Sequence, residues 1–247
     1  MLNVNKGHPV AIIDGGNNSG KIIYIDETMD RGYESIGLED GKMRMLMDYF
    51  SRKVYFIAGP AGSGKTTFAA NLIKDYLKMY PDCEFYFISR TIGNDDPALK
   101  GLKINQIRLD DSLINNPINI EKEIGKRSIF FFDDCNTITD EKLKSYVEKL
   151  MYDIMEVGRK LNINIIITQH LLNSSEKKLG RAIMNELNFM TFFPRSGSAH
   201  SINYCLKTYF GLTKKHIDHI LNLPSRSVTI SKNYPMYILY DKGIYIL

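Results

Sequence analysis

Residues 59–66, Gly-Pro-Ala-Gly-Ser-Gly-Lys-Thr, constrain the fold of this chain more than any other stretch. They match the pattern G-x-x-x-x-G-K-[ST] at every required position. Residues 54–58 ahead of them form a short apolar run typical of a buried strand. Residues 67–80 carry apolar side chains at helical spacing until Pro81 stops the pattern. A strand, this loop and a helix in succession predict a phosphate-binding loop.

The residue types in this loop suit the phosphates of a nucleotide. Glycines let the backbone approach the phosphates, and backbone N–H groups form an anion-binding nest at a helix N-terminus. We expect Lys65 to neutralise the β- and γ-phosphates and the Thr66 hydroxyl to hold Mg²⁺. The expected nucleotide contacts come from Gly59, Pro60, Ala61, Gly62, Ser63, Gly64, Lys65, Thr66 and Thr67.

A second stretch, residues 15–21, also satisfies G-x-x-x-x-G-K. Here Ile22 replaces the Ser or Thr that would hold Mg²⁺, and a β-branched run follows where a helix should begin. No helix dipole would therefore face a phosphate. We interpret this stretch as the turn of a β-hairpin between residues 9–13 and 21–25, and we expect a helix over residues 38–50.

The composition is that of an ordinary globular chain. With 247 residues, of which 44% are hydrophobic and 24% charged, it can bury one substantial core. The net charge of +4 is too small to indicate nucleic-acid binding by itself. Three cysteines without C-x-x-C spacing favour reduced thiols over a structural zinc site. Without a signal-peptide pattern or a membrane-length apolar run, we expect a soluble, intracellular protein with no membrane insertion.

After the loop, apolar strands alternate with helical segments. Expected strands cover residues 84–89, 106–109, 128–132, 164–168 and 188–193, and a long helix covers residues 140–160. This alternation gives right-handed crossovers, so it predicts an α/β fold, a mostly parallel sheet with helices on both faces. A further helix over residues 212–221 and strands at 227–230, 236–240 and 244–247 close the chain.

These segments predict three parts of the chain. Residues 1–50 form an N-terminal β-hairpin and helix, residues 51–200 the P-loop core, and residues 201–247 a C-terminal helix and β tail packed on the core. The fold class therefore includes β-hairpin additions at both termini.

Two carboxylates close the strand that ends near residue 132. Residues 129–134 read Ile-Phe-Phe-Phe-Asp-Asp. Asp133 stands where a Walker B aspartate would hold the Mg²⁺ shell, and Asp134 where a carboxylate polarises the attacking water. The alternative is an Asp-Asp turn after a core strand.

Polar residues also end the strand at residues 164–168. Ligands of a parallel sheet lie beyond the C-terminal ends of its strands, so Gln169 is placed to contact the γ-phosphate or the attacking water. A strand-end amide that bonds its own loop fits the spacing equally well. We interpret His170 as structural or as a contact to a neighbour.

Arg159 lies near the end of the long helix. A basic residue there suits a helix C-terminus. The other interpretation is an arginine finger, which inserts into the nucleotide site of a neighbouring subunit. Arg181 and Arg195 are rivals for that role, and Arg195 follows the strand at 188–193 on the expected ligand side of the sheet.

In this order, the segments resemble the FtsK–HerA superfamily of DNA-pumping ATPases. Within it they are most similar to the genome-packaging ATPases of large nucleocytoplasmic DNA viruses. The resemblance spans residues 50–200 and is carried by residues 59–66, 130–134, 158–163 and 165–170. The family places an arginine just before the strand that ends in a sensor glutamine, and Arg159 and Gln169 match. Cellular members usually carry Asp-Glu where this chain has Asp-Asp, which weakens the case for Asp134 as the base.

The resemblance implies a RecA-like core with an additional strand between the P-loop and Walker B strands. It implies hydrolysis of ATP with Mg²⁺, with Lys65, Asp134, Gln169 and a trans-acting Arg159 as catalytic residues and Thr66 and Asp133 as metal ligands. It also implies a homo-oligomeric ring, a pentamer or hexamer, around double-stranded DNA, with a capsid or vertex protein as a further partner. A viral protein of this kind would act in the host cytoplasm, at the viral factory, or in the virion.

Two other functions stay open. A nucleoside or nucleotide kinase usually carries an Arg-rich lid, and only Arg90 with residues 95–96 resembles a substrate site. A non-catalytic nucleotide switch would need neither Asp134 nor Gln169. For the motor, we expect the loop around residues 91–103, with Arg90, Lys100 and Lys103, to contact DNA phosphates.

Overall fold

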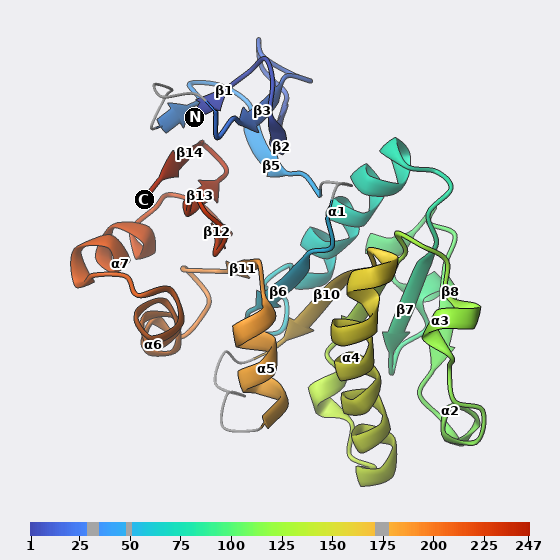
Figure 1. Cartoon of the computed structure of the whole chain (residues 1–247). Coiled ribbons are helices and arrows are strands. Elements are labelled where there is room, and N and C mark those ends of the chain that lie inside the picture. The colour runs from blue at the N-terminus through green and yellow to red at the C-terminus, as the bar shows by residue number, and fades with distance from the viewer. Residues whose placement is uncertain (29–34, 48–50, 171–177) are drawn as a thin grey trace. The chain divides into compact units, whose positions relative to one another are not determined.

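A computed structural model describes residues 1–28, 35–47, 51–170 and 178–247 of the chain (Figure 1). The chain divides into two compact units. The P-loop unit is Tyr49–Leu187, and the terminal unit combines Met1–Asp48 with Asn188–Leu247. Residues 188–200, which the sequence analysis placed in the core segment, therefore group with the two ends of the chain.

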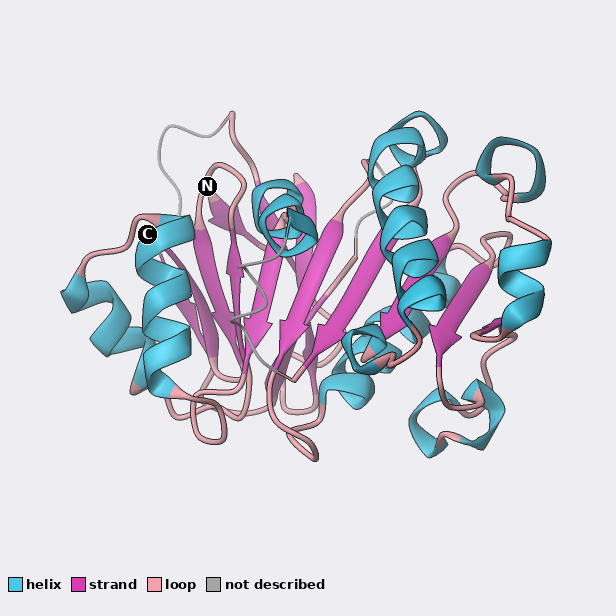
Figure 2. Ribbon diagram, turned by 90° about the horizontal axis from the view of Figure 1, so that it is seen from below, coloured by secondary structure: helices cyan, strands magenta, loops and turns pink. Residues whose placement is uncertain are grey.

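The P-loop unit is built on a parallel sheet (Figure 2). Its strand order is β6 (Val54–Ala58), β10 (Asn164–Gln169), β9 (Ile129–Asp133), β7 (Phe85–Ser89) and β8 (Asn105–Arg108). Each neighbouring pair in this order is parallel. Every residue of β6, β9 and β10 is buried, which explains why these strands are apolar throughout and do not alternate. The additional strand is β10, and its place between β6 and β9 confirms the RecA-like order.

Two long helices make the crossovers that flank the sheet. Helix α1 (Lys65–Met79) joins β6 to β7, and helix α4 (Glu141–Leu161) joins β9 to β10. The two crossovers run in opposite directions across the sheet, so right-handed connections place the helices on opposite faces. This confirms the expected helices on both faces. The remaining elements of the unit are η1 (Gly93–Asp95), η2 (Pro97–Leu99), α2 (Asp111–Asn115), α3 (Ile120–Glu123), η3 (Cys135–Thr137) and α5 (Lys178–Glu186).

Local capping sets the ends of α4 and thereby the position of Arg159. The Asp140 carboxylate accepts a hydrogen bond from the N–H of Leu143 at 2.8 Å, which caps the helix N-terminus. At the other end Asn162 adopts the left-handed conformation, with φ of 57°. Arg159 consequently lies in the last helical turn.

The terminal unit contains two antiparallel sheets. One has the order β1 (Leu2–Asn3), β3 (Ile22–Ile25), β2 (His8–Asp14) and β5 (Lys42–Met45). In the other, β4 (Ser35–Gly37), β14 (Gly243–Ile246), β13 (Tyr237–Tyr240), β12 (Val228–Ser231) and β11 (Phe189–Phe192) follow one another. Helices α6 (Ala199–Phe210) and α7 (Lys214–Leu221) complete the unit. The β2–β3 hairpin confirms that residues 15–21 form a turn between strands.

The helix predicted over residues 38–50 is wrong. Residues 42–45 form β5, in which Met43 and Met45 are buried while Lys42 and Arg44 are not. This alternation has the period of a strand. Gly41, with φ of 72°, precedes the strand, and a side chain there would collide with the backbone carbonyl of Gly15. Residues 48–50 of the prediction lie outside the described residues.

The strand predicted over residues 188–193 forms as β11. Strand β11 pairs antiparallel with β12, and the hydroxyls of Thr191 and Thr229 lie 2.8 Å apart across this pair. Helix α6 was not predicted from the sequence, although Ser198 caps its start and Gly211, with φ of 66°, ends it.

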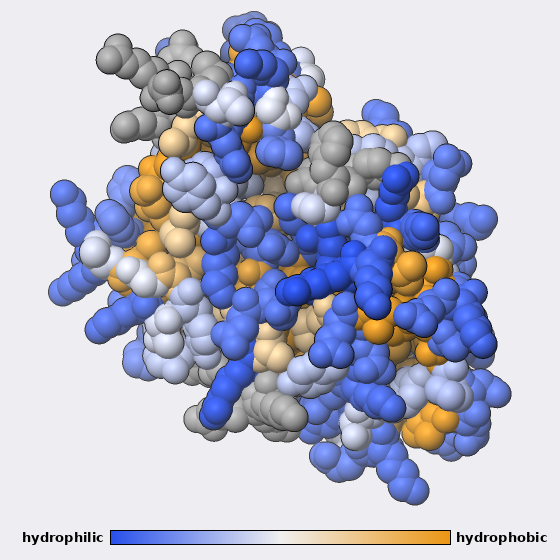
Figure 3. Space-filling view, in the orientation of Figure 1, coloured by the Kyte–Doolittle hydropathy of each residue, from blue (hydrophilic) through white to orange (hydrophobic). Residues whose placement is uncertain are grey.

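Among the described residues, no helix has the length and apolarity that crossing a membrane requires. The face seen in Figure 3 is mainly hydrophilic, and its hydrophobic residues form separate areas between hydrophilic ones.

Candidate active site at the phosphate-binding loop

The loop between β6 and α1 curves around the N-terminus of the helix. Gly62 and Gly64 have φ of 74° and 105°, values that residues other than glycine rarely adopt. Gly64 is the N-cap of α1, and the Ser63 N–H donates to the Pro60 carbonyl at 3.2 Å. The helix dipole favours an anion at this terminus. The predicted strand, loop and helix are therefore present in the predicted order.

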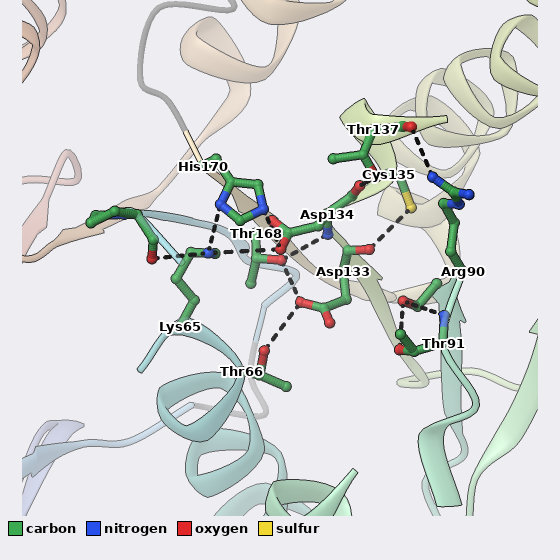
Figure 4. A network of polar contacts seen from close by, with 12 residues as sticks. Lys65, Thr66, Arg90, Thr91, Asp133, Asp134, Cys135, Thr137, Thr168 and His170 are labelled. Atoms are coloured by element: carbon green, nitrogen blue, oxygen red, sulfur yellow. Dashed lines mark hydrogen bonds and ion pairs between the residues drawn. The ribbon is translucent and has the colours of Figure 1, made fainter. Parts of the chain in front are cut away.

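Lys65 is buried at the start of α1, with 5% of its side chain exposed. Its Nζ lies 3.4 Å from the Pro60 carbonyl oxygen, 3.4 Å from Nδ1 of His170 and 3.7 Å from Oδ2 of Asp134 (Figure 4). A buried ammonium needs such partners because its desolvation is costly. The structure thus brings Lys65 and Asp134 together, although 69 residues separate them in sequence.

Asp133 and Thr66 also meet at this point. The Thr66 hydroxyl donates to Oδ1 of Asp133 at 3.4 Å. Burial raises the pKa of Asp133, the hydrogen bond from Thr168 acts against this, and the neighbouring charge of Asp134 raises it further. A hydroxyl and a carboxylate side by side are oxygen ligands of the type that Mg²⁺ takes. These two residues therefore fit the metal expected for them.

Thr168 positions both carboxylates. Its hydroxyl donates to Oδ1 of Asp133 at 2.6 Å and accepts the N–H of Asp134 at 3.0 Å (Figure 4). Thr168 and Asp133 face one another in the register of β10 and β9, and Thr168 is fully buried. Asp134 stands in the left-handed region, with φ of 47°, directly after β9. This turn sends the Asp134 side chain toward Lys65.

The end of β10 joins the loop directly. The backbone carbonyl of Gln169 accepts a hydrogen bond from the N–H of Gly59 at 3.1 Å, and Gln169 faces Ala58 in the strand register. Its side chain is buried. The next residue, His170, has Nε2 at 3.0 Å from Oδ2 of Asp134. Both residues that follow Thr168 therefore lie at the loop.

Arg159 is engaged elsewhere in the same unit. Its Nη2 lies 2.6 Å from Oε2 of Glu186 on α5, and 64% of its side chain is exposed. Arg52 reaches the same oxygen at 3.6 Å but is only 8% exposed. Burial lowers the pKa of Arg52, and the charge of Glu186 opposes this. An open cavity of about 530 Å³ lies beside the pair, lined by Tyr152, Met155, Glu156, Arg159, Ala182, Asn185 and Glu186.

The two rival arginines occupy different places. Arg181 is exposed on α5, and Arg195 is exposed after β11 in the terminal unit. Arg90, Lys100 and Lys103 are exposed as well, and Arg90 donates to the Thr137 carbonyl at 3.4 Å.

Three residues at the phosphate-binding loop and at the Arg159–Glu186 pair were not identified from the sequence. Thr168 and Glu186 were given no role, and His170 was left outside the site. A threonine at the end of the strand before Gln169 was the available signal for Thr168. Its bond to Asp133 depends on which strands pair, and the sequence alone does not show that.

Comparisons with known proteins give the chain's family and its fold. No protein-family profile matches the chain. The chain is 40% identical over 244 residues to protein V3 of Sputnik virophage, which covers 98% of this chain and 97% of V3. It is 25% identical over 250 residues to the ATP-binding protein MJ1301 of Methanocaldococcus jannaschii, and it spans 48% of that protein's length.

Two solved structures share the fold. B204, the DNA-packaging ATPase of Sulfolobus turreted icosahedral virus, matches with a TM-score of 0.51 and 10% identity, over 76% of this chain and 96% of B204. VirB4 of Thermoanaerobacter pseudethanolicus matches with a TM-score of 0.57 and 8% identity, over 97% of both chains. At such identities the likeness shows the fold. The chain therefore belongs to the family of protein V3 of Sputnik virophage and has the fold of the FtsK–HerA-type P-loop ATPases.

Proposed function

We propose that the chain is an ATPase that uses ATP hydrolysis to translocate double-stranded DNA, and that it packages a viral genome into a capsid. One observation carries the hydrolytic part: Lys65 and Thr66 on α1 lie within 3.7 Å and 3.4 Å of Asp134 and Asp133. The virophage origin of V3 and the fold shared with a viral DNA-packaging ATPase support the rest.

The chain's own residues divide the reaction between them. Lys65 and the N-terminus of α1 bind the β- and γ-phosphates. Thr66 and Asp133 would hold Mg²⁺, which neutralises charge on the phosphates when bound. Asp134 orients a water whose oxygen attacks the γ-phosphorus. The bond from that phosphorus to the ADP oxygen breaks, so ADP and inorganic phosphate form and one proton passes to solvent.

Asp134 suits this role because its second oxygen is unused. Oδ1 of Asp134 is buried and has no hydrogen-bond partner among the described residues. A buried acceptor without a partner is costly, so a ligand that brings a donor would relieve it. Gln169 contacts the γ-phosphate in this proposal.

Arg159 would complete the site of a neighbouring copy in a ring of five or six subunits. Its exposure leaves the guanidinium accessible, and its bond to Glu186 can exchange for a phosphate. Arg90, Lys100 and Lys103 would contact DNA phosphates, because exposed cations bind the backbone without reading sequence. A capsid or vertex protein would be the further partner, in the host cytoplasm at the viral factory or in the virion.

Phosphate release by the purified chain tests the proposal. We expect hydrolysis of ATP that requires Mg²⁺, rises with linear duplex DNA and disappears in Lys65→Ala. ATP binding without hydrolysis, with or without DNA, would favour a nucleotide switch. Transfer of phosphate to nucleosides would favour a kinase. Size measurement with a non-hydrolysable ATP analogue tests the ring, and a monomer in all conditions would contradict it.

A further inference from the structure

His170 lies between the loop lysine and the second carboxylate. It directly follows β10, and 36% of its side chain is exposed. Nε2 is 3.0 Å from Oδ2 of Asp134, and Nδ1 is 3.4 Å from Nζ of Lys65 (Figure 4). One imidazole nitrogen therefore contacts Asp134 and the other contacts Lys65. The proposed function gives a role to each of these two partners.

These two partners assign the hydrogen of a neutral imidazole. An ammonium only donates hydrogen bonds, so Nδ1 accepts from Lys65. Nε2 then carries the hydrogen and donates it to Asp134. A carboxylate that holds one ring nitrogen in this way fixes the tautomer and the orientation of the other. Asp134 thereby points the lone pair of Nδ1 toward Lys65.

The position of Lys65 also indicates where phosphate would lie. If Lys65 binds the β- and γ-phosphates, Nδ1 of His170 stands within hydrogen-bond reach of the same region. Once the ammonium turns to the phosphates, the Nδ1 lone pair loses its donor. A water molecule beside the γ-phosphate can supply a new one.

We propose that His170 is a further catalytic residue, which orients the attacking water through Nδ1 while Asp134 holds the ring. This inference rests on the proposed ATPase function. The step is the one given above: water oxygen bonds to the γ-phosphorus, the bond to ADP breaks, and the proton passes to solvent. Toward this water, Nδ1 of His170 only accepts a hydrogen bond, and it takes no proton in the step.

Steady-state ATPase kinetics of three variants test the role. His170→Ala removes both nitrogens, and we expect kcat to fall by about 10²-fold with KM for ATP unchanged. His170→Asn keeps a polar atom near the Nδ1 position, and His170→Gln keeps one near Nε2. We expect His170→Asn to retain more activity than His170→Gln. His200→Ala, on the exposed start of α6, is the matched control and should leave kcat unchanged.

A double-mutant cycle separates this role from a merely structural one. If Asp134 holds His170, Asp134→Ala and His170→Ala together should cost less than the product of their separate losses. Unchanged kcat in His170→Ala, or tighter ATP binding with unchanged kcat, would overturn the inference and leave His170 as a resting partner of Lys65. If the wild-type chain itself fails to hydrolyse ATP, the proposed function fails and the inference with it. Circular dichroism on each variant excludes misfolding as the cause of a loss.

Discussion

The Thr168 hydroxyl donates a 2.6 Å hydrogen bond to Oδ1 of Asp133 from the strand beside it. The hydroxyl oxygen of Thr168 in turn accepts a hydrogen bond from the N–H of Asp134 at 3.0 Å. One buried hydroxyl thus holds the metal-ligand candidate and sets the backbone turn of the next carboxylate. The two acidic residues at the end of β9 are therefore positioned by β10 as well as by their own strand.

Replacement of Thr168 should affect both stability and turnover. Thr168→Val keeps the shape of the side chain but leaves the buried Asp133 and the Asp134 N–H without this partner. We expect a loss of about 1–3 kcal/mol in the free energy of unfolding. We also expect a clear fall in kcat of ATP hydrolysis. Thr168→Ser keeps the hydroxyl and should restore most of both. Urea unfolding and phosphate release are the measurements, and wild-type values for Thr168→Val would contradict the assignment.

Glu186 should matter to folding through Arg52 more than through Arg159. Arg52 is 8% exposed and Arg159 is 64% exposed, although both contact the same carboxylate oxygen. Glu186→Gln leaves a buried guanidinium without its counter-charge, and we expect a loss of about 1–3 kcal/mol in unfolding free energy. Arg159→Ala breaks only an exposed pair and should change stability by less than about 1 kcal/mol. Urea unfolding measures both variants. Equal losses of unfolding free energy in Glu186→Gln and Arg159→Ala would contradict the larger role of buried Arg52.

Arg159 should act on a site in another subunit. A trans-acting finger that stabilises phosphoryl transfer is worth on the order of 10³-fold in kcat, so Arg159→Ala alone should lose nearly all activity. Lys65→Ala subunits cannot hydrolyse ATP in their own nucleotide site, but they keep Arg159. Mixing them with Arg159→Ala subunits should restore part of the activity, because each supplies what the other lacks. Arg181→Ala and Arg195→Ala are the controls, because these two arginines are the rival candidates for the trans-acting finger. No recovery on mixing, or a larger loss in either rival, would reject this role for Arg159.

Asp26 should contribute to stability in acid. The Thr28 hydroxyl and N–H donate hydrogen bonds to it at 2.6 Å and 2.9 Å, and they lower its pKa from 3.8 to about 2. A group whose pKa is lower in the folded chain stabilises it above the unfolded value, and this effect disappears as pH falls toward the folded value. Wild-type stability should therefore decline between pH 3.8 and about 2 more steeply than that of Asp26→Asn. Thermal unfolding across this range checks it, and parallel curves for the two proteins would argue against it.

The features that depend only on residues close together in the sequence were predictable. The loop pattern, the apolar strands and the helical spacing of α1 and α4 each concern neighbouring residues, and the structure has them where the sequence indicated. The strand Lys42–Met45 was mistaken for a helix because its alternation is short and sits among turn residues. Its hydrogen bonds go to β2, which lies about 30 residues earlier.

The contacts that depend on pairing were not predictable. Thr168 meets Asp133 only because β10 inserts beside β9, and His170 reaches Lys65 only because β10 also pairs with β6. The antiparallel pairing of β11 with β12 joins two strands that are separated in sequence by two helices. Glu186 lies on α5, 27 residues after Arg159, and the contact between them depends on tertiary packing.

The most direct test of the central claim is DNA-stimulated ATP hydrolysis compared in two lysine variants. Lys65 is the first residue of α1, directly after the phosphate-binding loop, whereas Lys21 ends the similar loop of the β2–β3 hairpin, where its Nζ donates to Oδ1 of Asn18 at 2.8 Å. We predict Mg²⁺-dependent phosphate release that duplex DNA stimulates in the wild type and in Lys21→Ala, and that Lys65→Ala abolishes. Turnover that survives in Lys65→Ala, or a wild-type chain that releases no phosphate with ATP, Mg²⁺ and duplex DNA, would contradict the account.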